Sequence, residues 1–154
     1  RLSAEDRDSL MAVSEGGEEC QCRSERAWCG VRATKGVHEG KWYFECTVSD
    51  RGLCRVGWST RQAKLELGTC PQGFGYGGTS KKSHARRFED YGEPYGLGDV
   101  IGCAIDLDEG TLWFSKNGVC LGEAFEIPGA LRGRVLYPAF CLKNAELRVS
   151  FGAQ

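Results

Sequence analysis

Basic residues are most concentrated between positions 81 and 87, in a short segment that holds Lys81, Lys82, His84, Arg86 and Arg87. Lysine and arginine bind phosphates, and an aromatic ring can stack on a nucleobase, so Tyr76 and Tyr91 on either side make RNA one candidate ligand. Glu89, Asp90 and Glu93 follow directly and would balance the charges of an ordinary solvated loop. A protein partner with acidic residues would suit the same cluster. We therefore expect a basic surface loop, with a protein partner ranked above RNA.

Four further cations are candidates for the same binding surface: Arg32, Lys35, Arg55 and Lys143. Their positions along the chain do not decide whether they share a face with the basic loop. The net charge of -1 gives the chain no overall field toward nucleic acid or membrane, so electrostatic binding must come from a local patch.

The glycine-rich run Gly73 to Gly78 has the G-x-G-x-x-G spacing of dinucleotide-binding loops. Such a loop needs a helix directly after it to hold the pyrophosphate, whereas Thr79 to His84 show no helical period. The sequence also lacks G-x-x-x-x-G-K-[ST], the phosphate-binding loop of many NTPases. We interpret the glycines as residues that bend a strand beside a second sheet.

The carboxylates and histidines give little support to catalysis. Asp106 and Asp108 lie on the polar phase of an alternating segment that runs into a glycine turn, where acidic residues are ordinary. A sugar-cleaving enzyme would need two carboxylates facing each other across a cleft. A hydrolase would need His84 to be buried beside a serine or cysteine and a carboxylate. We expect a non-enzymatic chain, with no catalytic residue, metal ion or other cofactor.

The nine cysteines are odd in number and contain no C-x-x-C pair, and only two histidines accompany them, which argues against a zinc site. Cys46, Cys54 and Cys103 fall on the apolar phase of alternating segments and are expected to be buried thiols in a reducing compartment. We expect the nucleus and cytoplasm. The role of Cys20 and Cys22 stays open. No apolar run is long enough to cross a membrane.

Period-two alternation predicts strands over residues 41–48, 54–58, 101–107 and 112–114, with two closing strands over 136–142 and 147–151. The first two segments are expected to form a hairpin, and Asn117-Gly118 to close a three-stranded meander. Ser59 and the residues after it predict a short helical turn. With 22 glycines in 154 residues, the fold class is all-β, an antiparallel, twisted β-sandwich of two sheets with at most one short helical turn. Residues 1–9 are expected to be a mobile lead or the remnant of a domain boundary, and residues 10–154 one domain.

The order of these blocks resembles a SPRY domain over nearly the whole chain: RATKGVHEGKWYFE, GLCRVGWST, GDVIGCAIDLDEGTLWFSKNG and LYPAF. GFGYGGTSKKSH, AFEIP and LKNAEL are most similar to the SPRY insert of a DEAD-box ATP-dependent RNA helicase. The resemblance implies an interaction module in a protein linked to RNA processing, next to a RecA-like domain. ATP and magnesium would belong only to the parent helicase core. An inserted domain also implies that Arg1 and Gln154 lie close together.

Many SPRY domains bind a peptide beside an apolar stretch after the late Tyr-Pro strand. That stretch is Leu142-Lys143-Asn144 in this chain, which makes the basic loop the better candidate surface. A lectin-like, sugar-binding sandwich is the alternative, because Trp28, Trp42, Trp58 and Trp113 are many for this length. Sugar binding would need an exposed tryptophan, whereas Trp42 and Trp58 lie on the phase expected to face the core.

Overall fold

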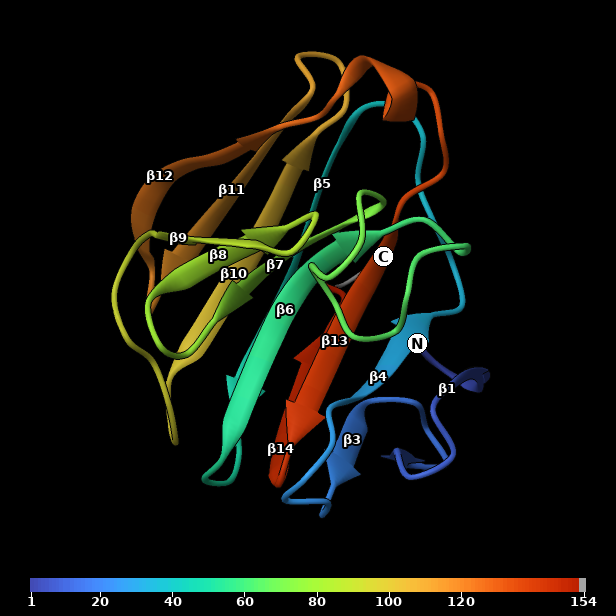
Figure 1. Cartoon of the computed structure of the whole chain (residues 1–154), viewed down its shortest axis with the longest axis vertical. Helices are drawn as coiled ribbons and strands as arrows, with labels where there is room; N and C mark the ends of the chain where they lie inside the picture. Colours follow the sequence, from blue (N-terminus) through green and yellow to red (C-terminus); the bar gives the residue numbers. More distant parts are fainter. Residues whose placement is uncertain (153–154) are drawn as a thin grey trace.

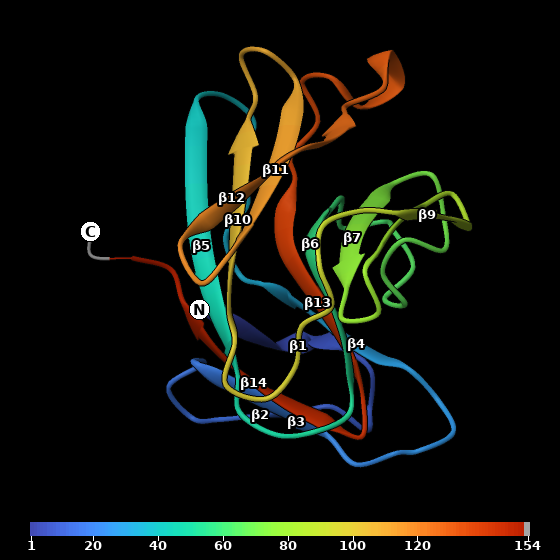
Figure 2. The ribbon, with the colours of Figure 1, turned by 90° about the vertical axis from the view of Figure 1, so that its left-hand side faces the viewer.

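Two antiparallel sheets face each other across an apolar core in the computed structural model, which describes residues 1–152 (Figures 1 and 2). The first sheet has the strand order β1-β4-β13-β6-β7-β8-β9, and the second has the order β12-β11-β10-β5-β14-β3-β2. In the first sheet the strands are β1 (Leu2–Arg7), β4 (Cys29–Ala33), β13 (Tyr137–Lys143), β6 (Leu53–Ser59), β7 (Gly73–Gly77), β8 (Lys81–His84) and β9 (Arg87–Asp90). In the second they are β12 (Val119–Glu126), β11 (Thr111–Lys116), β10 (Val100–Asp106), β5 (Lys41–Val48), β14 (Ala145–Ser150), β3 (Glu19–Cys22) and β2 (Ala12–Val13). The predicted two-sheet sandwich is confirmed.

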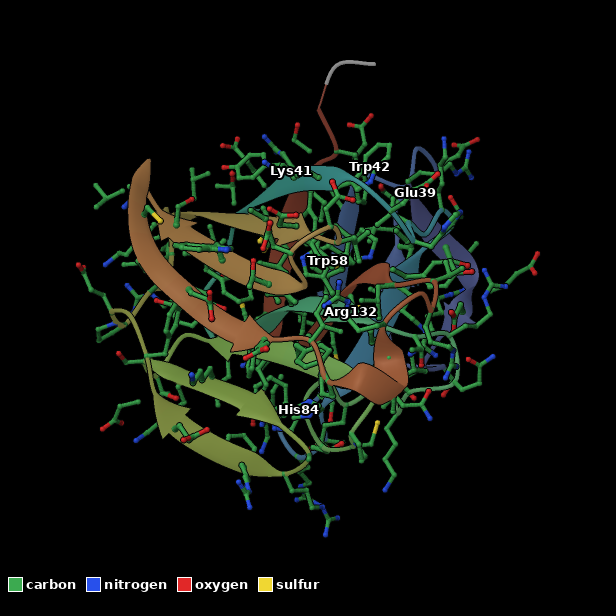
Figure 3. The ribbon with its side chains drawn as sticks, turned by 90° about the horizontal axis from the view of Figure 1, so that it is seen from above. Glu39, Lys41, Trp42, Trp58, His84 and Arg132 are labelled. Atoms are coloured by element: carbon green, nitrogen blue, oxygen red, sulfur yellow. The ribbon has the colours of Figure 1, made fainter. Side chains whose placement is uncertain are left out.

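The core follows from the alternation of β5 and β10, which pair with Phe44 opposite Cys103 and Cys46 opposite Ile101. All four of these side chains are buried between the sheets. Trp42, expected in the core on the same phase, is instead 44% exposed. It lies near the start of β5, where its indole N–H donates to the Glu39 carbonyl at 2.7 Å, and Figure 3 shows it beside Glu39 and Lys41.

The predicted hairpin of residues 41–59 is wrong, because β5 and β6 belong to different sheets. Gly52 has φ +116° at this crossing, and a Cβ there would lie 1.9 Å from the Asn144 carbonyl oxygen. The crossing from β5 to β6 therefore packs backbone against backbone with the crossing from β13 to β14, which contains Asn144. The predicted meander is confirmed for β10, β11 and β12, with Asn117 and Gly118 at positive φ between the last two.

Residues 1–9 do not form the expected lead. Leu2 is completely buried, and β1 pairs with β4 through Leu2 opposite Ala33 and Arg7 opposite Val31. Asp8 accepts a hydrogen bond from the backbone N–H of Gly30 at 2.7 Å. The apolar Leu2 and the bonds to β4 make this segment an edge strand of the first sheet, so the domain includes it.

The helical turn predicted after Ser59 is also absent from the described structure, where one 3-10 turn, Gly129–Leu131, is the helical element. No helix in residues 1–152 is long and apolar enough to span a membrane. Gln154 lies outside the described residues, so its expected closeness to Arg1 is untested. Arg1 and Phe151 nevertheless line one pocket.

Candidate interaction surface

The predicted basic loop is a β-hairpin at the edge of the first sheet, formed by β8 and β9. Ala85 and Arg86 connect the strands with φ of 51° and 67°, the left-handed conformation of a two-residue hairpin turn. The Ala85 N–H donates to the Cys70 carbonyl at 3.2 Å, and the Arg86 N–H to the Gly68 carbonyl at 3.0 Å. Because successive strand residues point to opposite faces, this geometry divides the basic side chains between two faces.

Lys82 and His84 face the second sheet and hold the hairpin in place. The Lys82 ammonium donates to the Ala124 carbonyl at 2.7 Å and lies 5.4 Å from the centre of the Phe125 ring. The His84 ring stacks on Phe74 at 4.4 Å, with Nδ1 3.0 Å from the Gly73 carbonyl. Both side chains are therefore engaged in packing contacts. The hydrolase arrangement, with His84 beside a serine or cysteine and a carboxylate, is not formed among the described residues.

Lys81 faces the outside, where it forms an ion pair with Asp90 on the neighbouring strand. This hydrogen-bonded ammonium lowers the pKa of the Asp90 carboxyl. Arg86 and Arg87 are exposed, and neither side chain has a hydrogen bond or ion pair in the described structure. The free positive charge of the hairpin therefore lies at its tip.

An outer pocket of about 270 Å³ opens beside Lys81 and brings together residues from three parts of the chain: Trp28, Arg55, Lys81, Ser83 and Phe88. The guanidinium carbon of Arg55 lies 4.1 Å from the centre of the Trp28 ring and 5.1 Å from that of Phe88. Such stacking holds a guanidinium by cation–π attraction and keeps its N–H groups in the plane between the rings.

Arg55 is further fixed by a hydrogen bond to the Leu67 carbonyl at 3.2 Å and by Glu66 at 3.7 Å. Its side chain is 13% exposed, whereas Phe88 is 48% exposed. The Ser83 hydroxyl, in the same lining, is buried and has no hydrogen-bond partner among the described residues. The outer pocket thus offers a fixed cation and an apolar ring to a ligand.

The other three predicted cations lie in three different environments. Lys143 ends β13 opposite Leu53, which lines the outer pocket, so Lys143 lies at the margin of this surface. Lys35 lines a different pocket together with Trp42. Arg32 is 4% exposed and binds both oxygens of Asp6 at 2.8 and 3.0 Å. The expectation that Arg32 contributes to a binding surface is therefore wrong, because it is a buried, paired charge.

Sequence reasoning missed Trp28 and Phe88. Strand pairing carries the only available signal for Phe88, since its position opposite Ser83 places both residues on the outer face of the hairpin. Trp28 precedes β4 and reaches Arg55 only through the order of strands in the first sheet. No local sequence pattern predicts the order of the strands in a sheet.

The three cysteines predicted to be buried, Cys46, Cys54 and Cys103, are buried in the structure. Burial raises the pKa of Cys54 and of Cys141 to about 12, so neither is a thiolate at neutral pH. No group of three or more His, Cys, Asp or Glu side chains in residues 1–152 is arranged to hold a metal ion.

Comparison with known proteins identifies the family. The SPRY domain model matches residues 41–154. The chain is 55% identical over 98% of its length to the ATP-dependent RNA helicase Ddx1 of Drosophila melanogaster, and 47% identical over its full length to ATP-dependent RNA helicase DDX1 of Xenopus laevis. It is also 48% identical over 97% of its length to the probable ATP-dependent RNA helicase ddx1 of Dictyostelium discoideum.

The chain spans about a fifth of the length of these helicases, 21%, 21% and 19% respectively. The catalytic core of a helicase, with its ATP and magnesium, is thus not in this chain. The crystal structure of the SPRY domain of human HERC1 has a TM-score of 0.84 and 19% identity, and the match covers 100% of this chain and 99% of that one. The sequence match over residues 41–154 and the shared two-sheet fold agree, and the chain belongs to the SPRY domain family.

Proposed function

We propose that this chain is the non-catalytic interaction module of an RNA helicase and that it docks an acidic segment of a protein partner at the outer pocket and the hairpin tip. The observation that carries the proposal is Arg55, held between Trp28 and Phe88 in an open pocket. A guanidinium fixed before binding loses little conformational entropy when a carboxylate pairs with it.

The surroundings of Arg55 supply the rest of a peptide-binding surface. Phe88 offers half-exposed apolar area for a side chain next to the carboxylate. Arg86 and Arg87 at the hairpin tip add unpaired positive charge, which attracts an acidic segment and speeds its encounter. Lys81 contributes less, because Asp90 already neutralises it.

A protein partner is favoured over RNA because the two tyrosines that flank the basic segment are already packed. Tyr76 is completely buried, and its ring lies 5.2 Å from that of Tyr91 in an edge-to-face contact. The Tyr91 hydroxyl donates to the Gly122 carbonyl at 2.6 Å. Single-strand recognition depends on rings that are free to stack on bases, and neither tyrosine is free.

Selection of peptides from a random library displayed on phage, with this domain as the target, tests the proposal. We expect enriched peptides to carry clustered Asp or Glu next to an apolar residue. They should lose binding to the double variant Arg86→Glu, Arg87→Glu and keep it for Arg134→Glu, a charge reversal at an exposed residue that does not line the outer pocket. Enriched peptides without acidic residues, or equal binding to both variants, would overturn the proposal.

A parallel arm measures the fluorescence anisotropy of a labelled single-stranded RNA at several salt concentrations. Binding that falls steeply with salt and disappears in the hairpin double variant would mean that the surface binds the phosphate groups of RNA. RNA binding would then replace the protein-partner proposal. We expect no specific RNA binding at physiological salt. A role in RNA processing, residence in the nucleus and cytoplasm, and contact with a flanking RecA-like domain stay predictions.

A further inference from the structure

A second pocket, here called the end pocket, lies where β4 ends and β5 begins. Its volume is about 200 Å³, and Lys35, Val37, Trp42, Phe44, Trp58 and Pro138 are part of its lining. The end pocket and the outer pocket share no lining residue. Figure 3 shows Trp42 at the edge of the molecule opposite His84, with Trp58 further inside.

Trp58 in the wall of the end pocket has an unsatisfied hydrogen-bond donor. The side chain is 2% exposed, and its indole N–H has no acceptor among the described residues. The ring packs edge-to-face against Phe44 with 5.1 Å between centroids. Buried donors are almost always paired in folded proteins, so an orphaned donor in a pocket wall indicates that a ligand brings the acceptor.

The rim of the end pocket shows which ligand would fit. Lys35 is exposed and has no hydrogen bond or ion pair, and no aspartate or glutamate lines the pocket. Trp42 presents an exposed ring whose N–H is already bonded to the Glu39 carbonyl, so the ring offers apolar area only. An occupant must therefore be apolar in the middle, accept a hydrogen bond inside and carry negative charge at the rim.

The size of the end pocket favours a side chain over a cofactor. Small-molecule sites typically enclose roughly 300–1,000 Å³, which is more than this pocket offers. One large apolar side chain of an extended peptide fills a smaller space, and the backbone on either side supplies carbonyl acceptors.

We infer that the end pocket binds an extended peptide segment of a partner protein, with an apolar side chain inserted, a backbone carbonyl accepting from the Trp58 indole, and a neighbouring carboxylate at Lys35. This site goes beyond the proposed function because it uses neither Arg55 nor the hairpin. A partner could occupy both pockets, and each site is separately testable because the two share no residue.

The test follows the indole N–H signals of the ¹⁵N-labelled domain by NMR during titration with the capped dipeptide acetyl-Leu-Asp-amide. The four tryptophans give four indole signals, assigned by single Trp→Phe variants. The Trp58 signal is expected to move downfield as its N–H gains an acceptor. Acetyl-Leu-Lys-amide places a positive charge, in place of the negative one, next to Lys35. It is expected to bind about tenfold more weakly, equivalent to about 1.4 kcal/mol.

Two variants separate this site from the outer pocket. Lys35→Glu is expected to weaken acetyl-Leu-Asp-amide about tenfold and to reverse the preference between the two dipeptides. Arg87→Glu at the hairpin tip is expected to leave unchanged both affinities read from the Trp58 signal, because that signal reports on the end pocket alone. A Trp58 signal that stays still at saturating dipeptide, equal affinity for the two dipeptides, or a larger response to a methyl glycoside than to either would overturn the inference.

Discussion

Replacing Asp6 by asparagine is expected to destabilise the domain strongly, although Asp6 lies in the segment that sequence reasoning placed outside it. Arg32 is 4% exposed and forms a two-pronged contact with Asp6, with N–O distances of 2.8 and 3.0 Å. The remaining guanidinium nitrogen, Nη1, donates to the Ala63 carbonyl at 2.9 Å. Asp6→Asn keeps the shape of the side chain but leaves the arginine charge buried without its counter-ion.

The size of the effect follows from this burial. Removing one partner of a buried ion pair costs about 3–5 kcal/mol, and the partial exposure of Asp6 places this pair near 3 kcal/mol. For a domain of this size, that loss corresponds to a fall in melting temperature of roughly 6–12 °C. Urea denaturation followed by circular dichroism measures the free energy of unfolding directly.

Glu19→Gln is the matched control, because Glu19 pairs with Arg148 while both side chains are more than half exposed, at 54% and 66%. An exposed pair contributes at most about 1 kcal/mol, so this variant should stay near the wild type. The double variant Asp6→Leu, Arg32→Met should recover most of the stability, since an apolar pair can replace a buried ion pair. If Asp6→Asn unfolds at the same urea concentration as Glu19→Gln, the reasoning about β1 is refuted.

Three further predictions test the fold. A thiol reagent should label exposed Cys120 first and half-buried Cys70 more slowly, whereas the seven buried cysteines should react only on unfolding. Mass spectrometry identifies the labelled cysteines, and fast labelling of Cys54 in the native state would contradict its burial. Gly52→Ala should lower the free energy of unfolding by about 2 kcal/mol or more, because φ is +116° and the new Cβ would meet Asn144. The control Gly118→Ala has open space around the new Cβ and should lower the free energy of unfolding by only about 1 kcal/mol. Urea denaturation measures both values. Hydrogen bonds lower the pKa of Asp50, Asp90 and Asp99 below the ordinary 3.8. The stability that these carboxylates contribute should therefore be complete above about pH 4 and be lost as the pH falls through their lower folded-state pKa values. Melting temperatures that rise on acidification below pH 4 would refute this sign.

The parts of the fold that are encoded locally could be predicted from the sequence. The meander of β10, β11 and β12 follows from period-two alternation and from Asn117-Gly118, which adopts the backbone conformation of a tight hairpin turn. The same alternation in β5 and β6 led to a wrong pairing. Alternation shows that one face of a strand is buried, and it is identical whether the chain turns back within a sheet or crosses to the opposite one.

The candidate site could be predicted only in part, because it depends on contacts between distant segments. The basic residues were identified, but their division between two faces required the register of β8 and β9, in which Lys81 lies opposite Asp90. Ala85 and Arg86 carry no glycine or asparagine signal for a tight turn, which hid the hairpin. The contact of Trp28 with Arg55 and the burial of Arg32 beside Asp6 both need the order of strands in the first sheet.

The exposed tryptophans bear on the sugar-binding alternative. Trp42 and Trp113 are 44% and 37% exposed, so an exposed ring of the kind that a lectin needs is present. The Trp113 indole N–H is bonded to the Thr111 hydroxyl at 2.9 Å, and that of Trp42 to Glu39. Both rings are therefore held in place as apolar surface, and that of Trp42 lines the end pocket, where it suits the inferred peptide segment.

The central claim is that a fixed guanidinium in the outer pocket recognises an acidic partner segment, and the affinity of a selected acidic peptide for Arg55→Lys tests it most directly. Lysine keeps the charge but loses the planar group that stacks between Trp28 and Phe88. We expect the dissociation constant, measured by calorimetry, to rise at least tenfold for Arg55→Lys, while Arg134→Glu, which changes neither pocket, binds as the wild type does. Equal affinity of Arg55→Lys and the wild type would contradict the account, because charge alone would then explain the binding.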